Sequence, residues 1–257
     1  MKTNLRSESP SDTAVTGARR PPGRTHLRLV RRARTAVKRL TGRECWHRVQ
    51  VKRPREFHGT EYGGWWVCPD LLSETSVVYS FGVGEDVSFD LSIVRRFGLR
   101  VFAFDPTPRV IEWIARQRVP ERFTFVPVGL AAADGTRRFF PPANPADVSH
   151  SILPRSDVQP TEIVVRRLST ILAEQGHTTL DLLKIDIEGA EYEVLDDLLA
   201  SSLRPTQLLV EFHHGAAYGG LTLDDKRRAV GNLVAAGYRI VAISDIGMEY
   251  SFVHERT

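Results

Sequence analysis

The 257-residue chain lacks any long apolar run and has only two cysteines, Cys45 and Cys68. Its apolar runs stay well short of the roughly 18 to 20 residues that a membrane-spanning helix needs, so no transmembrane segment is expected. The two cysteines have no partners at the spacing of a zinc site or of a disulfide framework. This scarcity favours a reducing compartment, and we expect a cytoplasmic location.

Acidic residues are scarce at the N-terminal end of the chain. Residues 1–55 hold 16 Lys and Arg against three Asp and Glu, whereas the remaining residues hold 19 Lys and Arg against 28 Asp and Glu. The basic character therefore belongs to the N-terminal segment and not to the rest of the chain. We expect no nucleic-acid binding by the folded domain, because its own charge balance is acidic.

Composition divides the chain into three parts. Residues 1–24 are rich in Ser, Thr, Pro and Arg, which predicts a disordered basic leader. Residues 25–72 are predicted to form a basic helix over 25–40 and an aromatic extension, and residues 73–257 a single α/β domain. The helix has an apolar stripe formed by Leu27, Val30, Ala33, Val37 and Leu40. Packing of the helix on the domain is the favoured interpretation, and peripheral contact with a membrane surface or an anionic partner is the alternative.

The rest of the chain is organised around one strand–turn–helix–strand unit. Residues 77–81 are apolar, β-branched or aromatic and predict a buried strand, which ends at a turn containing Gly82 and Gly84. A helix is expected over residues 86–97, and a second buried strand ends at Asp105. This order places the bare backbone of the turn and the carboxylate at the C-terminal edge of a parallel sheet, where nucleosides bind.

The residues after the glycines help to choose the ligand. Glu85 and Asp86 open the helix, and their carboxylates would repel the pyrophosphate of a dinucleotide. S-adenosylmethionine has a sulfonium, an ammonium and a ribose diol but no phosphate, so the acids favour it, with Asp105 accepting the ribose hydroxyls. An NAD-dependent oxidoreductase is the alternative enzyme class. A plain turn whose glycines only relieve strain is the alternative without a ligand, since a short G-x-G pattern is weak evidence.

Three further segments are expected near the ligand. A third strand over residues 123–128 runs into Gly129 and Leu130, which could lie along an adenine face. A Pro-rich loop over residues 141–160 could cover the site. Adjacent tryptophans are costly to expose, so they either cover the core, which is favoured, or flank the cofactor pocket; they are Trp65 and Trp66.

The second signature is DLLKIDIEGAE at residues 181–191. Residues 182–187 predict a buried strand, and Asp186, Glu188 and Glu191 crowd its C-terminal end. Three acids there are costly unless they are paired, bind a cation or begin a helix. A divalent cation held by Asp186 or Glu188 is the less favoured of these interpretations.

A histidine pair follows the next predicted strand. Residues 207–212 are apolar up to Glu211 and Phe212, and His213 and His214 come directly after them. Neighbouring parallel strands would bring these histidines close to the acids of the second signature. The pair could be ordinary loop residues or could take part in catalysis, and the sequence leaves both interpretations open. The last two strands, joined by a short turn, are predicted to be antiparallel.

The order of these elements resembles the class I S-adenosylmethionine-dependent methyltransferases. More narrowly, FAFDPTP, LLKIDIEGAE and LLVEFHH look like the motifs of the FkbM-type methyltransferase family. The resemblance covers about residues 79–254, so that residues 73–257 would form the methyltransferase domain. It implies an α/β fold with a doubly wound, mostly parallel seven-stranded sheet and an antiparallel C-terminal strand. The first motif, YSFGVGE, departs from the family pattern of an acid before the glycines and an Asn near the second one.

The resemblance also implies a reaction and a set of residues. S-adenosyl-L-methionine would contact Phe81, Gly82, Gly84, Asp105, Pro106, Gly129, Leu130 and Asp186. The methyl group would pass to a hydroxyl of a small molecule or a carbohydrate, with His213, His214 or Glu188 assisting at the acceptor. A non-enzymatic interaction protein on a degenerate methyltransferase scaffold is the remaining alternative.

Overall fold

The computed structural model describes residues 25–140, 159–215 and 218–255. The leader predicted for residues 1–24 lies outside them, as does most of the loop over residues 141–160 that was expected to cover the site. None of the helices in the described part of the chain has the length and apolar character needed to cross a lipid bilayer.

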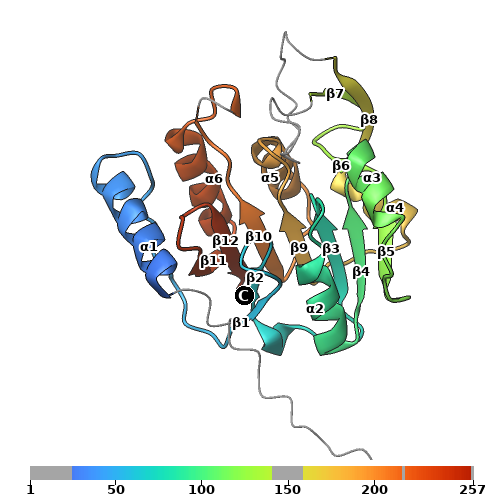
Figure 1. Cartoon of the computed structure of the whole chain (residues 1–257), viewed down its shortest axis with the longest axis horizontal. Coiled ribbons are helices and arrows are strands. Elements are labelled where there is room, and N and C mark those ends of the chain that lie inside the picture. Colours follow the sequence, from blue (N-terminus) through green and yellow to red (C-terminus); the bar gives the residue numbers. More distant parts are fainter. Residues whose placement is uncertain (1–24, 141–158, 216–217, 256–257) are drawn as a thin grey trace, which may run out of the picture.

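A seven-stranded sheet forms the centre of the molecule, in the order β11-β12-β10-β9-β3-β4-β5 (Figure 1). Its strands are β3 (Val77–Phe81), β4 (Arg100–Phe104), β5 (Phe123–Val126), β9 (Leu182–Ile185), β10 (Gln207–Glu211), β11 (Tyr238–Ile243) and β12 (Glu249–His254). Only β12 runs antiparallel to its neighbours, and the other pairs are parallel. The predicted fold class, a doubly wound and mostly parallel sheet with an antiparallel C-terminal strand, is therefore confirmed.

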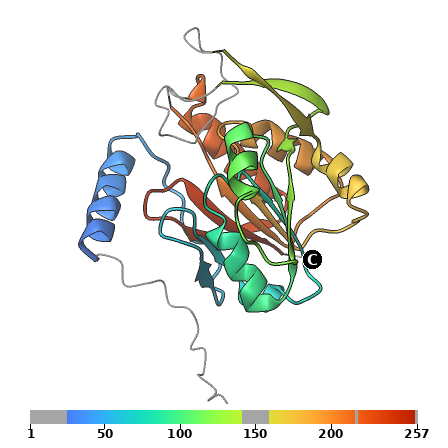
Figure 2. The ribbon, with the colours of Figure 1, turned by 45° about the vertical axis from the view of Figure 1, so that its right-hand side comes forward.

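Helices cover both faces of this sheet, as Figures 1 and 2 show. One face packs against α4 (Leu168–Glu174), α5 (Glu191–Ala200) and α6 (Leu223–Ala235). The other face packs against α2 (Ser88–Phe97) and α3 (Pro108–Ile114). Strands covered on both faces need apolar side chains in succession, and the four residues of β9 are all buried, including a lysine.

Two small sheets border the large one. The first pairs β1 (Glu56–His58) with β2 (Trp65–Val67), which a short 3-10 turn, η1 (Pro69–Leu71), follows. The second contains β6 (Gly129–Leu130), β7 (Gly135–Phe139) and β8 (Thr161–Arg166), in the order β6-β8-β7.

The second small sheet corrects one prediction. The strand expected over residues 123–128 ends at Val126, because Pro127 has no N–H to continue the ladder of hydrogen bonds. Gly129 and Leu130 pair instead with β8, beside the large sheet. They therefore approach the predicted cofactor site from a separate layer.

Helix α1 (Thr25–Leu40) has the predicted bounds but an unexpected orientation. It lies at one edge of the molecule (Figure 1). Its contact with the domain runs through Thr35, which is 5% exposed, whereas Val37 and Leu40 of the apolar stripe are 58% and 76% exposed. The C-terminal part of the stripe thus points away from the domain on which the helix was expected to pack, whereas Val30 is half-buried.

Candidate functional site

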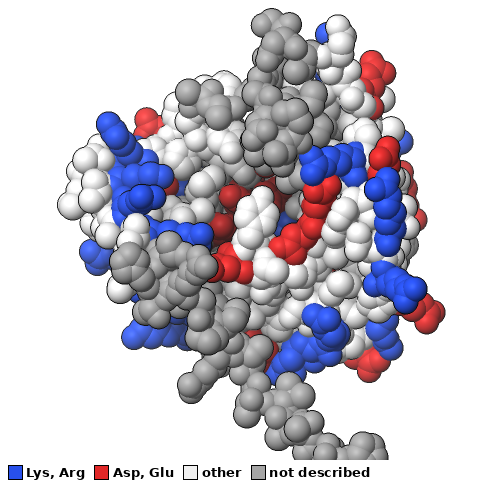
Figure 3. All heavy atoms as spheres, in the orientation of Figure 1, with Lys and Arg blue, Asp and Glu red and all other residues white. Residues whose placement is uncertain are grey.

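A cavity of about 630 Å3 opens at the C-terminal edge of β3, β4, β9 and β10. The turn after β3 and the loop after β9 form its floor, the small sheet β6-β8-β7 forms one wall, and β2 with the turn before it forms another. Eleven Asp and Glu residues line it, against three Lys and Arg. Figure 3 shows acidic side chains gathered in the central hollow. An excess of carboxylates in a recessed site favours a cationic ligand.

The glycine turn after β3 combines close packing with an open backbone. Gly82 has a φ of 71°, and a Cβ there would lie 1.6 Å from the carbonyl oxygen of Asp186, so no other residue fits. Gly84 has a φ of 56°, and a Cβ there would meet no atom within 4 Å. The backbone of Gly84 therefore faces free space in the cavity.

Asp105 stands at the end of β4 with 5% of its surface exposed. Its Oδ2 accepts the N–H of Gly84 at 3.0 Å, and its Oδ1 accepts the N–H of Thr107 at 2.9 Å. Burial raises the pKa of this carboxyl group, although these hydrogen bonds oppose the rise. The backbone thus holds the carboxylate in one orientation at the cavity floor.

An apolar wall lies beside this carboxylate. The rings of Phe81 and Phe104 stack with centroids 4.4 Å apart, and both residues line the cavity. Gly129 lets the wall close, because a Cβ there would lie 3.1 Å from Pro106 and from Val165. Such a surface suits the flat, apolar face of a purine.

Glu85 and Asp86, the two acids after the glycine turn, differ in whether a cation offsets their charge. Arg109 donates two hydrogen bonds to Glu85, at 2.7 and 2.9 Å, so the charge of Glu85 is offset. Asp86 accepts the N–H of Ser88 at 2.9 Å and the hydroxyl of Thr60 at 2.5 Å. Burial would raise the pKa of Asp86, but these hydrogen bonds lower it. The charge that the sequence predicted at this turn therefore rests mainly on Asp86.

Lys184 is a site residue to which the sequence analysis assigned no role. Its side chain is buried in β9, and Nζ donates hydrogen bonds to the carbonyl oxygens of Phe81 at 3.2 Å and Gly82 at 2.9 Å. Nζ also lies 3.6 Å from Asp186 and 5.7 Å from the ring centroid of Trp65. A lysine within an otherwise apolar strand was the feature of the sequence that could have indicated this role. Lys184 links the glycine turn to Asp186, which follows its own strand.

Trp65 and Asp90 complete the surroundings of this lysine. Trp65 is 4% exposed and lines the cavity, so it covers the core and flanks the pocket at once. Asp90, on α2, is 1% exposed, and its Oδ1 has no hydrogen-bond partner among the described residues. Burial raises the pKa of Asp90 to about 6, although the charge of Lys184 opposes the rise.

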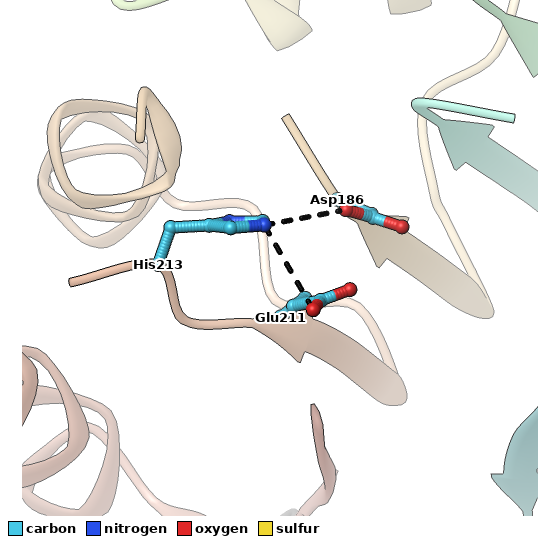
Figure 4. Close-up of side chains that lie close together, drawn as sticks. All are labelled: Asp186, Glu211 and His213. Carbon is cyan, nitrogen blue, oxygen red and sulfur yellow. Dashed lines mark ion pairs between the residues drawn. The ribbon is translucent and has the colours of Figure 1, made fainter. Parts of the chain in front are cut away.

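A histidine enclosed by carboxylates follows β10, and Figure 4 shows its ring pointing toward Asp186 and Glu211. Nε2 of His213 lies 3.5 Å from Glu188, 3.8 Å from Glu211 and 4.0 Å from Asp186. Nδ1 of the same ring lies 3.3 Å from Glu191. Both ring nitrogens therefore face negative charge, which stabilises the protonated imidazolium.

The pKa values of this cluster follow from that arrangement. Burial alone would lower the pKa of His213, but the close pairing of its ring with Glu191 and the charges of Glu191, Glu211 and Asp186 outweigh it and raise the pKa to about 10. Burial, together with the charges of Asp186 and Glu249, raises the pKa of Glu211 well above its usual value. At neutral pH His213 is thus a cation within the cavity.

The third acid of the second signature positions the other groups. Glu191 has no exposed surface, and its two oxygens accept the N–H of Gly189 at 2.8 Å and the N–H of His213 at 2.6 Å. Glu188 has a φ of 54°, a conformation that is strained for a residue with a side chain. The strained loop directs Glu188 into the cavity, which it lines.

Comparison with known proteins places this geometry in a family. A family model described as the methyltransferase FkbM domain matches residues 71–240. The chain belongs to this family. A probable methyltransferase-like protein 24 from Rattus norvegicus and another from Homo sapiens are each 28% identical to it over 160 residues. Each match covers 58% of this chain and 38% of the relative, so the chain matches well under half the length of these curated relatives.

Solved structures also resemble the FkbM domain. The fibrillarin pre-rRNA processing protein of Methanococcus jannaschii matches with a TM-score of 0.42 and 11% identity, covering 72% of this chain and 69% of that one. The precorrin-6y C5,15-methyltransferase of Geobacter metallireducens matches with a TM-score of 0.40 and 14% identity, covering 71% and 82%. The assignment of the chain rests on the family model and on the sheet topology.

The cavity of the FkbM domain fits S-adenosylmethionine, the cofactor expected for this family. It offers the open backbone at Gly84, the fixed carboxylate of Asp105, an apolar wall and the unpartnered oxygen of Asp90. The negative carboxylates of the cavity suit the positive sulfonium and ammonium groups of this cofactor. The pyrophosphate of a dinucleotide would be repelled by the carboxylate of Asp86.

One predicted residue lies elsewhere. The predicted site residues that line the cavity are Phe81, Gly82, Gly84, Asp105, Pro106, Gly129, Leu130, Asp186, Glu188 and His213. His214 is not among the residues that line it, since its ring turns to the opposite side of the backbone, with Nε2 3.7 Å from Glu44. Glu44 is in turn paired with the buried Lys226 at 2.8 Å.

One group in the described part of the FkbM domain has the composition of a metal site. Asp186, Glu211 and His213 present ligand atoms that all lie within 4.8 Å of one another (Figure 4). Two carboxylates and one imidazole are suitable ligands for several divalent metals. A metal would need the neutral form of His213, so it would compete with the proton that the carboxylates stabilise.

Proposed function

We propose that the FkbM domain transfers the methyl group of S-adenosylmethionine to a hydroxyl group of a small molecule or a carbohydrate. The observation that carries the proposal is a single cavity that joins the glycine turn and Asp105 to the cluster of His213 with its carboxylates. The first part suits the nucleoside of the cofactor, and the second suits an acceptor that must lose a proton. Both parts stand at the same edge of the sheet, which brings the two reactants together.

The proposal gives each part of the cofactor site a role. The carboxylate of Asp105 accepts the two ribose hydroxyls, and the open backbone at Gly84 lies along the methionine portion. The apolar wall of Phe81, Pro106, Gly129 and Leu130 holds the adenine ring. Asp186, between the two halves of the cavity, stabilises the positive charge near the methyl group.

The acceptor reaction requires a place for one proton. The acceptor oxygen forms a bond to the methyl carbon as the carbon–sulfur bond breaks, and the hydroxyl proton passes to a base. His213 is protonated at neutral pH and has no free lone pair. We therefore assign the base to Glu211 or Glu188, the carboxylates nearest to Nε2 on either side, with His213 holding them in place. His214 has no part in this step, because it lies outside the cavity.

Titration with S-adenosylhomocysteine tests the cofactor part of the proposal. We expect saturable binding measured by calorimetry, and a loss of at least about tenfold in affinity for Asp105→Ala, because one fixed carboxylate binding two hydroxyls contributes a few kcal/mol. Asp70→Ala is the matched control, since Asp70 is a half-exposed carboxylate paired with Arg53 away from the cavity. Unchanged affinity in Asp105→Ala, or saturable NADH binding without S-adenosylhomocysteine binding, would contradict the assignment.

Transfer of a labelled methyl group to a panel of acceptors tests the second part. Hydroxylated small molecules and sugars should become labelled. Either Glu211→Gln or Glu188→Gln, whichever removes the base, should reduce the rate by about a hundredfold while cofactor affinity stays within about twofold. Labelling of amines or of RNA, with hydroxyl acceptors unlabelled, would contradict the proposed acceptor class. It would not contradict the proposed cofactor site.

A further inference from the structure

Helix α1 presents its apolar side to solvent. Leu29, Ala33, Val37 and Leu40 recur at intervals of three and four residues and so share one side of the helix, named here the outer stripe. Leu29, Val37 and Leu40 are 61%, 58% and 76% exposed. A helix of a water-soluble domain normally turns such residues toward the core. In α1 these apolar residues face solvent instead.

Specific contacts hold the helix in this orientation. Thr35 lies about 200° around the helix from Ala33 and Val37, and it is buried against the turn at Gly247. On the same side, Arg31 lies 3.3 Å from Glu61, and Arg32 lies 3.9 Å from Asp245. The polar side of α1 therefore faces the domain.

The chain directly after α1 is anchored more firmly. Glu44 is 3% exposed and pairs at 2.8 Å with Nζ of Lys226, which also donates to the carbonyl oxygen of Gly247 at 2.6 Å. Nδ1 of His47 lies 2.9 Å from the hydroxyl oxygen of Tyr250. These buried polar contacts fix the end of α1 on the domain, so the outer stripe is held outward.

A basic border surrounds the outer stripe. Residues 25–55 hold eleven Lys and Arg against one acid, Glu44, which is buried. The side chains of Arg34, Lys38 and Arg43 are exposed, and Figure 3 shows Lys and Arg gathered on the side of the molecule where α1 lies. Trp46, directly after the helix, is 60% exposed. No exposed acid in this segment offsets the positive charge.

We propose that α1 docks on the surface of an anionic lipid membrane, with the outer stripe inserted between the headgroups and the basic border in contact with them. An amphipathic helix with apolar residues on one side, Lys and Arg beside them and a nearby tryptophan is the form that lies in the plane of a bilayer surface. The attraction of each basic residue to acidic lipids adds to the burial of the stripe. The charge favours lipid over a second copy of the chain, because two such helices would repel each other.

Docking would also orient the proposed active site. Arg31, on the side of α1 that faces the domain, lines the cavity together with Glu61 and Asp245, the acids that hold the helix. The cavity would therefore open beside the membrane surface. The inference itself does not rest on methyl transfer, since lipid binding is measured without cofactor or acceptor.

Flotation of the purified full chain with vesicles tests the inference. We expect the chain to float with vesicles of phosphatidylcholine containing about 30% phosphatidylserine, and not with phosphatidylcholine alone, and to be released as salt is raised. Leu40→Asp and Val37→Asp should each weaken partitioning by about tenfold or more, because they place a carboxylate in the outer stripe. Arg34→Glu should weaken it to a similar degree.

Matched variants separate docking from general effects. Val119→Asp changes an apolar residue that is 37% exposed between α3 and β5, and Arg116→Glu changes an exposed arginine nearby. Both should float like the parent chain, and circular dichroism should show that all five variants are folded. No flotation with acidic vesicles, or flotation that Leu40→Asp does not change, would overturn the inference.

Two other occupants would give distinct results. A dimer in light scattering that Leu40→Asp dissociates, without flotation of the parent chain, would show that a second copy covers the stripe and would overturn the proposal. Binding to RNA that Arg34→Glu abolishes and Leu40→Asp leaves unchanged, again without flotation, would do the same in favour of a polyanion.

Discussion

The cavity and helix α1 lie side by side with opposite charges. Eleven acids and three Lys and Arg line the cavity, while residues 25–55 hold eleven Lys and Arg and one acid. Two ion pairs join the regions, from Arg31 to Glu61 and from Arg32 to Asp245. The formal net charge of the chain is only +4, so it reveals neither the acidic cavity nor the basic helix.

The two regions differ in how their charges are held. In the cavity, buried groups such as Asp105 and Lys184 are fixed by hydrogen bonds to the backbone. On α1 the side chains of Arg32, Arg34 and Lys38 are exposed to solvent, where ion pairs contribute little to stability. We infer that substitutions in the cavity change the stability and pH dependence of the fold, whereas substitutions on α1 change association. The following predictions test that division.

Gly82→Ala should have the largest effect on stability. A methyl group at this position would lie 1.6 Å from the carbonyl oxygen of Asp186, and the φ of 71° disfavours alanine as well. We expect a loss of at least about 3 kcal/mol in the free energy of unfolding, measured by denaturant titration. Gly84→Ala is the matched control, since φ is also positive but the methyl group meets free space, and it should cost about 1 kcal/mol. Equal losses in the two variants would contradict the packing argument.

Lys184→Met should follow, with a loss of about 3 kcal/mol in the free energy of unfolding. The substitution keeps much of the volume but removes the cation beside Asp186, and it leaves the carbonyl oxygens of Phe81 and Gly82 without their donor. Lys38→Met, on the exposed side of α1, is the control and should change stability by less than about 0.5 kcal/mol. Similar values for the two variants would remove the distinction between the regions.

His213→Gln should change the pH dependence of stability. The pKa of His213 is about 10 in the folded protein, above its unfolded value of 6.5, so its contribution is complete below pH 6.5 and is lost as the pH rises through 10. The parent chain should therefore lose stability across this window, by an amount on the order of a few kcal/mol, more steeply than the variant does. Thermal unfolding from pH 6.5 to 10 measures the difference.

A histidine at the opposite edge of the sheet provides the control for that series. His254→Gln changes a residue at the end of β12, where Nε2 lies 3.1 Å from the carbonyl oxygen of Ala236. This variant should keep the steep pH dependence of the parent chain. If His213→Gln keeps the same slope as well, His213 does not carry the charge that the geometry assigns to it.

Arg32→Ala should have the smallest effect. Its ion pair with Asp245 spans 3.9 Å, and the arginine side chain is 68% exposed. We expect a change of less than about 0.5 kcal/mol in the free energy of unfolding, at low and at high salt. A loss comparable to that of Lys184→Met would show that α1 contributes to the stability of the domain as the cavity does.

Much of the fold could be predicted from local patterns. The strands at 77–81 and 207–211 and the helix at 25–40 follow from apolar periodicity, and Gly98 ends α2 in the left-handed conformation. The family motifs at Asp105 and around Asp186 place those residues at one sheet edge, as the structure confirms. These features depend on residues close together in the chain.

The sequence by itself therefore determined the family and the fold class, and most of the residues that it predicted for the site line the cavity. Only the tertiary structure decided that Lys184 binds the glycine turn, that carboxylates from separate segments keep His213 protonated, and that His214 turns toward Glu44. It also decided that the apolar side of α1 faces outward. The physical reason is that burial and long-range charge depend on neighbours distant in sequence, which periodicity does not report.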